Sequence, residues 1–171
     1  MDKDLIIGDV LQELAGTRRM LEKLPQEYMT WKPHEMSMSL GGLSTHLVNL
    51  LNWQSAILLH SEFDLASVSY RREALESPAA VLQEFDMRAR EIEKLISDSN
   101  VETLGAEWTL RNGAVVIRRQ SRAVALRTIG LNHMIHHRAQ LGVYFRLLNI
   151  PVPGLYGPSA DELANISDHI S

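Results

Sequence analysis

The chain has 171 residues, 45% of them hydrophobic and 22% charged, with a formal net charge of -4 and a pI near 6.0. These values are ordinary for a soluble globular protein, and we expect a single domain spanning residues 1–171. The acidic balance argues against a nucleic-acid partner, and the absence of cysteine excludes disulfides, thiolate metal sites and a cysteine nucleophile. No apolar run approaches the length of a membrane span, so we expect a cytoplasmic protein without membrane association.

Residues Asp4–Leu24 and the segment from Leu40 to about His60 are predicted to form the first two long helices. Apolar residues recur every three or four positions in both segments, which is the period of an amphipathic helix. Ser39 can cap the second helix, although Gly41-Gly42 weakens its first turn. The core-facing stripe of this second helix contains His46.

The third helix is expected after a loop. Residues Glu62–Glu76 have little periodicity and mixed charge, so we interpret them as a connection that could lie over the mouth of a site. Ser77-Pro78 is a strong helix start, with a capping serine followed by proline at the first helical position. The apolar pattern that follows predicts a helix ending near Asn100.

One small β-hairpin is predicted before the last long helix. The β-prone runs Trp108–Leu110 and Val115–Ile117 flank Asn112-Gly113, which is the strongest short hairpin signal. We expect Trp108–Ile117 to be the only sheet in the protein. The basic interval that follows, Arg118–Arg127, is interpreted as a solvated face.

The last long helix is predicted from Ser121 to Asn149, because its apolar pattern is long and Pro151 ends it. Beyond a tail rich in proline and glycine, the capping box Ser159–Glu162 predicts a short final helix. Four long amphipathic helices must bury their stripes against one another. The predicted fold class is therefore all-α, a four-helix bundle with one small β-hairpin before the last long helix.

Two histidines in the last long helix are candidate metal ligands. His133 and His137 are one turn apart, so they project from the same face, and we expect them within the buried stripe that includes Leu126 and Leu141. A buried neutral imidazole needs a partner, which is either a metal ion or an ordinary carbonyl or water. His136 should point to the flank of the helix, as an outer or surface residue.

Packing of the second helix against the last one could bring His46 to the same place as His133 and His137. No fourth protein ligand is evident in the sequence. Such a group would be a metal site of the kind that helical bundles build between facing helices. Asp86 and Glu84 are carboxylates of the third helix, but they fall outside its strict apolar stripe, and we nominate no general base.

Three segments together resemble the DinB family (DinB/YfiT-like metalloenzymes). They are Gly42-Leu43-Ser44-Thr45-His46, the run from His133 to Leu141, and the tail Ile150-Pro151-Val152-Pro153-Gly154-Leu155-Tyr156-Gly157-Pro158. The resemblance implies a bundle in which one divalent metal ion, nickel or zinc, is held by His46, His133 and His137. It also implies a homodimer.

The family resemblance indicates two classes of function. The first is a divalent-metal-dependent enzyme acting on a small molecule, a thiol-dependent S-transferase or a related metal-activated hydrolase. Any thiol must then be a low-molecular-weight cosubstrate, because the chain has no cysteine. The alternative is a non-catalytic metal-binding or stress-response protein with the same three-histidine site, since a fold does not fix a function.

Overall fold

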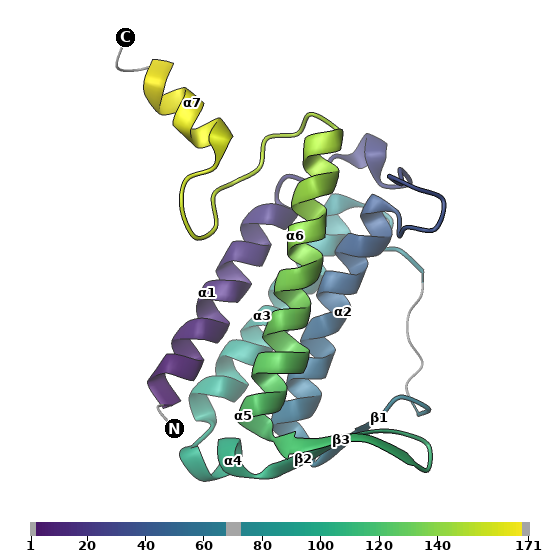
Figure 1. Cartoon of the computed structure of the whole chain (residues 1–171), viewed down its shortest axis with the longest axis vertical. Coiled ribbons are helices and arrows are strands. Elements are labelled where there is room, and N and C mark those ends of the chain that lie inside the picture. The colour runs from purple at the N-terminus through teal and green to yellow at the C-terminus, as the bar shows by residue number, and fades with distance from the viewer. Residues whose placement is uncertain (1–2, 68–72, 169–171) are drawn as a thin grey trace.

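The structure is a computed structural model that describes residues 3–67 and 73–168. Within these residues, four long helical segments lie side by side and a small sheet crosses one end of them (Figure 1). The segments are α1 (Lys3–Leu21), α2 (Leu40–Leu59), α3 (Pro78–Asp98) and a composite segment made of α5 (Arg122–Ala125), η2 (Leu126–Leu131) and α6 (Asn132–Leu147). The mainly helical class is confirmed. Shorter elements are η1 (Gln26–Tyr28), α4 (Val101–Gly105) and α7 (Ala160–Asp168).

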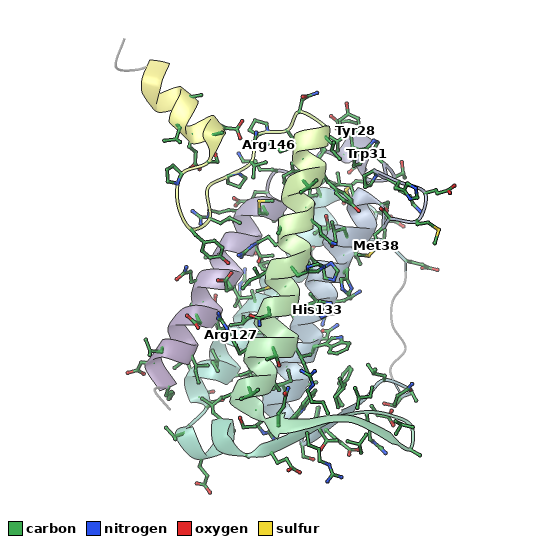
Figure 2. All side chains as sticks on the ribbon, viewed as in Figure 1. Tyr28, Trp31, Met38, Arg127, His133 and Arg146 are labelled. Carbon is green, nitrogen blue, oxygen red and sulfur yellow. The ribbon has the colours of Figure 1, made fainter. Side chains whose placement is uncertain are left out.

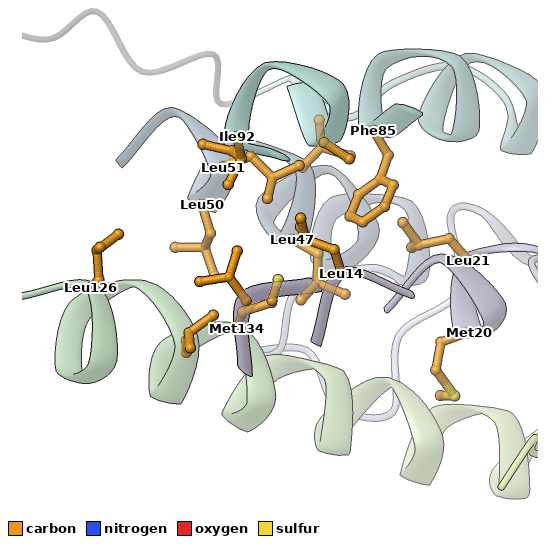
Figure 3. Packing of buried hydrophobic residues seen from close by; sticks show 14 of the residues in the cluster. Leu14, Met20, Leu21, Leu47, Leu50, Leu51, Phe85, Ile92, Leu126 and Met134 are labelled. Atoms are coloured by element: carbon orange, nitrogen blue, oxygen red, sulfur yellow. The ribbon is translucent and has the colours of Figure 1, made fainter. Parts of the chain in front are cut away.

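The core lies between these helices. Helix α3 packs on α1 and α2, and α6 packs on α1 and α2 from the other side. Leu14, Leu47, Phe85 and Met134 are at most 2% exposed and come from four different helices (Figure 3). Each such side chain contributes about 1.5–3 kcal/mol when it is removed from water, so the apolar stripes account for the packing of the helices.

The predicted helix starts are confirmed by their caps. The hydroxyl oxygen of Ser39 accepts a hydrogen bond from the backbone N–H of Gly42 at 3.0 Å, and Ser77 accepts one from Ala80 at 3.1 Å. Gly41 has a packing reason to be glycine. A Cβ atom there would lie 3.0 Å from the carbonyl oxygen of Met29, whose backbone approaches the first turn of α2.

The sheet differs from the prediction. Strands β2 (Glu107–Asn112) and β3 (Val115–Ser121) pair antiparallel around a turn in which Gly113 has a φ of +57°. A third strand, β1 (Glu62–Asp64), pairs parallel with β2, so the prediction that Trp108–Ile117 is the only sheet is wrong. The same strand falls in Glu62–Glu76, for which the sequence pattern predicts a loop.

Tertiary contacts hold β1 in the sheet. The backbone N–H of Gly113 donates to Oδ1 of Asp64 at 2.8 Å, and Arg111 forms ion pairs with Asp64 and Glu62. The ring of Phe63 packs on that of Trp53. A strand of three residues is too short to show a period of two, which explains why the sequence pattern did not indicate it.

The sequence predicts a continuous α-helix from Ser121 to Asn149, but the last long helical segment is interrupted. Residues Leu126–Leu131 form a π-helical turn between α5 and α6. Helix α6 ends at Leu147, and Asn149 follows with a positive φ of +57°. A π turn places more residues in each turn than an α-helix, so it rotates α6 relative to the residues before it.

The chain after α6 lies against α1 before α7 projects away from the other helices (Figure 1). The predicted capping box is present, because the N–H of Glu162 donates to Oγ of Ser159 and the N–H of Ser159 donates to Oε2 of Glu162. Asp161 forms an ion pair with Arg146 of α6. In the described part of the chain, no helix has the length and apolar character needed to cross a membrane.

Candidate metal centre

Three imidazoles meet between α2 and α6. His46 extends from α2, and His133 and His137 extend from successive turns of α6. One nitrogen atom from each ring can be chosen so that all three lie within 4.8 Å of one another. The ring of His46 is 5.3 Å from that of His133 and 4.4 Å from that of His137, measured between centroids. The structure therefore brings together the three residues that the sequence indicated.

The three rings are half-buried, whereas the sequence placed His133 and His137 within the buried stripe. The core-facing positions of α6 are instead Met134, Arg138 and Leu141, each one residue or one turn away from the histidines. Figure 2 shows His133 on the side of α6 toward α2. The cluster thus occupies the flank of the helix, where solvent and small molecules can reach it.

The π turn explains this offset. In an uninterrupted α-helix, residues seven apart share a face, so His133 would follow Leu126 into the core. The observed pair of core residues is Leu126 and Met134, which are eight apart and at most 1% exposed. The π turn between them accommodates one extra residue. This residue moves the histidines from the core to the edge facing α2.

His137 has a hydrogen-bond partner that the sequence analysis did not identify. Its Nδ1 atom lies 2.7 Å from Oε1 of Gln140, three residues later in α6. Because an amide oxygen only accepts, this contact requires a proton on Nδ1 and leaves Nε2 free to bind a metal ion. The spacing of three residues on a helix could have indicated this contact.

The surroundings keep the imidazoles neutral. Burial, together with the smaller effects of the neighbouring His137 and His133, lowers the pKa of His46 to about 4. Burial also lowers the pKa of His133 and of His137, although the hydrogen bond to Gln140 opposes the effect at His137. All three rings are therefore unprotonated at neutral pH. This is the state in which imidazole binds metal ions.

His136 lies outside the cluster. Its side chain is exposed, and its ring centroid is 4.9 Å from that of the adjacent His137. This position agrees with the expected flank or surface role. His60, at the carboxyl end of α2, is also exposed and does not belong to the cluster, and its backbone N–H donates to the carbonyl oxygen of Ala56.

The two carboxylates considered as bases are engaged elsewhere. Asp86 accepts two hydrogen bonds from the guanidinium of Arg18, which joins α3 to α1. Glu84 forms an ion pair with Arg88 one turn later in α3. Among the described residues, no carboxylate belongs to the group formed by the three imidazoles.

The core-facing residue next to His137 is a buried arginine, which sequence reasoning missed. Arg138 is 1% exposed, and its Nη2 atom lies 2.6 Å from Oε2 of Glu13 in α1. Its Nη1 atom donates to the carbonyl oxygen of Glu13 and to the hydroxyl of Thr17. The hydroxyl of Tyr156 contacts both Arg138 and Glu13. This network fixes α6 against α1 at the turn that carries His137.

Part of the loop expected over the site mouth contacts the cluster's own helix. The backbone N–H of Leu75 donates to Oγ1 of Thr45 at 2.8 Å, directly beside His46. Residues 68–72 of the same predicted loop lie outside the described residues. The contact at Leu75 joins the start of α3 to the second turn of α2.

The donor set fits a divalent metal ion of the borderline type. Three neutral imidazole nitrogens suit zinc, nickel, copper or iron, and they are a ligand set of catalytic zinc, which keeps a further position open. The three rings are only half-buried on the flank of α6, so the site is not sealed from solvent. The fold and the site together define a mainly helical protein with a candidate three-histidine metal centre.

The sequence pattern of the DinB family matches residues 9–169, and the chain belongs to this family. It is 25% identical to the uncharacterized protein YrdA of Bacillus subtilis (strain 168), over 89% of this chain and 86% of that one. Two solved structures share its fold at 19% sequence identity. A DinB-like protein of Bacillus cereus ATCC 10987 has a TM-score of 0.67, with 88% of this chain and 95% of that one covered. The DinB-like YjoA of B. subtilis has a TM-score of 0.64, with 86% and 95% covered.

Proposed function

We propose that His46, His133 and His137 bind one divalent metal ion, nickel or zinc, and that the protein is a metal-dependent enzyme acting on a small molecule. The observation that carries this proposal is the convergence of three unprotonated imidazoles, with ligand atoms within 4.8 Å, at a half-buried position. A fully buried position would suit a closed structural site better. A half-buried one suits exchange of ligands.

The charge of the site favours an anionic ligand. Three neutral imidazoles do not compensate the two positive charges of the ion, and no carboxylate of the described residues joins their group. The ion would lower the pKa of a thiol or water molecule at its open position. Because the chain has no cysteine, a thiol must come from a low-molecular-weight cosubstrate.

We favour a thiol-dependent S-transferase within the DinB type, with a metal-activated hydrolase as the related reaction, and this preference rests on the family to which the chain belongs. In the transfer, the sulfur of the cosubstrate forms a bond to an electrophilic carbon, and the leaving group departs with the electron pair of the broken bond. The contribution of the chain is to hold the three imidazoles in place. Two contacts hold them: Gln140 orients the ring of His137, and Arg138 anchors α6 to α1.

The test is the conjugation of a thiol to monochlorobimane. Purified protein loaded with nickel or zinc should accelerate the reaction with a low-molecular-weight thiol such as benzyl mercaptan, and His46→Ala should lose the acceleration. His136→Ala is the matched control, because it removes a nearby imidazole that lies outside the cluster. Equal rates for the loaded wild type and His46→Ala would contradict the transferase proposal for this substrate.

One observation supports the alternative of a non-catalytic metal-binding or stress-response protein. In the described part of the chain, the group contains three imidazoles and no carboxylate that could act as a general base. A protein that binds one metal ion at these histidines but accelerates neither thiol conjugation nor ester hydrolysis would support this alternative.

The oligomeric state is a separate proposal. We propose a homodimer, on the basis of the family to which the chain belongs. Light scattering at micromolar concentration should give twice the mass of the chain, which is 19.3 kDa. A single-chain mass would contradict it.

A further inference from the structure

An aromatic pair borders the three histidines on the side of the sheet. Trp53 follows His46 by two turns of α2, and its ring centroid lies 6.2 Å from that of His133, with the two rings nearly perpendicular. The ring of Phe63 lies 4.9 Å from that of Trp53 at an interplanar angle of 36°. The candidate metal centre therefore has an apolar wall, formed by Trp53 and Phe63.

The wall is held by the strand that the sequence did not indicate. β1 carries Phe63, and its next residue, Asp64, accepts a hydrogen bond from Gly113 and forms an ion pair with Arg111. These contacts fix Phe63 beside Trp53. Both rings are only partly buried against the core, so part of their surface remains available to another molecule.

We propose that the ligand completing the three-histidine site carries an aromatic ring, which packs against Trp53 and Phe63. This inference rests on the proposed function, because the other end of the ligand is the anionic atom at the open metal position. Aromatic rings pack well at centroid separations of about 4.5–7 Å, and the Trp53–His133 and Trp53–Phe63 distances lie in this range. A third ring placed at the edge of this group would continue the same packing.

The wall also distinguishes between ligands of equal metal affinity. A small hydrophilic thiol would leave the exposed surface of Trp53 and Phe63 in water, whereas an aromatic thiol would cover it. The ring of Trp53 lies 6.2 Å from that of His133, so an ion held by the histidines would lie beside the wall, and a ligand with a short link between sulfur and ring would reach both. The substrate class that follows is a small aryl-bearing thiol.

The experiment uses the full chain loaded with cobalt(II), whose visible absorption changes when a thiol binds. The probes are benzyl mercaptan and 2-mercaptoethanol, which have thiols of similar acidity and differ in the ring. In the wild type, benzyl mercaptan should bind about tenfold more tightly. Trp53→Ala should remove this preference, so that the two thiols bind the variant with affinities within about twofold of each other. Trp53→Phe should retain most of the preference.

The outcomes separate this inference from the proposed function. If cobalt binds and both thiols bind with equal affinity, the aromatic-ligand proposal is overturned and the metal site stands. The same holds if Trp53→Ala keeps the full preference. If the folded wild type binds no cobalt, as judged by metal analysis together with circular dichroism, the metal site itself is wrong and the inference fails with it. Phe63→Leu, which replaces the second ring by an aliphatic side chain, should reduce the preference in the same direction as Trp53→Ala.

Discussion

The Nδ1 atom of His137 lies 2.7 Å from Oε1 of Gln140, in the next turn of the same helix. This contact selects the tautomer in which Nε2 is free, and it fixes the rotation of the ring. Partners of this kind orient metal-binding imidazoles, and their loss reduces metal affinity by about 10- to 100-fold.

We therefore expect Gln140→Ala to weaken zinc binding by about 10- to 100-fold without a large change in folding stability, because Gln140 is exposed. Gln140→Glu retains an acceptor at the same position and should bind zinc at least as tightly as the wild type. Competition with a chromophoric chelator measures both affinities. Wild-type affinity in Gln140→Ala would show that the contact has no role in orienting His137.

A second prediction concerns the buried ion pair between Arg138 and Glu13. Removing one partner of a buried pair leaves the other charge without compensation, which costs about 3–5 kcal/mol. Arg138→Ala should therefore lower the free energy of unfolding in urea by about this amount. The matched control is Arg146→Ala, which breaks the more exposed pair with Asp161 and should cost less than about 1 kcal/mol. Similar losses in the two variants would contradict the role assigned to Arg138.

A third prediction concerns pH. In the folded metal-free protein the pKa of His46 is about 4, whereas in the unfolded chain it is near 6.5. Between these values the unfolded chain binds more protons, so lowering the pH through this window destabilises the folded state. His46→Leu lacks this contribution. As the pH falls from about 6.5 to about 4, the wild type should therefore lose more unfolding free energy than His46→Leu does.

Urea unfolding of metal-free wild type and His46→Leu at several pH values measures this difference. Carboxylates and the other histidines contribute to both proteins, so the comparison isolates His46. A difference that stays constant across the window would show that His46 is not held in a surrounding that disfavours its charge.

The helices and the three-histidine cluster could be predicted because each leaves a repeated pattern in the sequence. The apolar period and the capping residues Ser39 and Ser77 located α2 and α3, and the spacing of His133 and His137 placed both on one face of α6. That His46 joins them follows from the packing of α2 on α6. These patterns repeat every three to four residues, so they can be recognised in the sequence without knowledge of the tertiary contacts.

The remaining features depend on contacts between residues that are far apart in the sequence. Strand β1 is held by Gly113 and Arg111, about fifty residues later, and its three residues show no period. The π turn at Leu126–Leu131 has no distinct sequence pattern, yet it moves the histidines from the core to the flank. Arg138 was missed because a charged residue is seldom buried without a partner. Its partner is Glu13 of α1, and the sequence does not show that these two residues meet.

The most direct measurement of the central claim is metal analysis of His137→Ala and His136→Ala, purified without added metal and compared with the wild type. His137 belongs to the cluster, whereas its neighbour His136 is exposed and outside it. The account predicts about one divalent ion per chain in the wild type and in His136→Ala, and a melting temperature that falls on chelation in both, because binding stabilises the folded state. His137→Ala should contain no stoichiometric metal and show no effect of the chelator. Loss of the metal in His136→Ala, or its retention in His137→Ala, would contradict the assignment of the site.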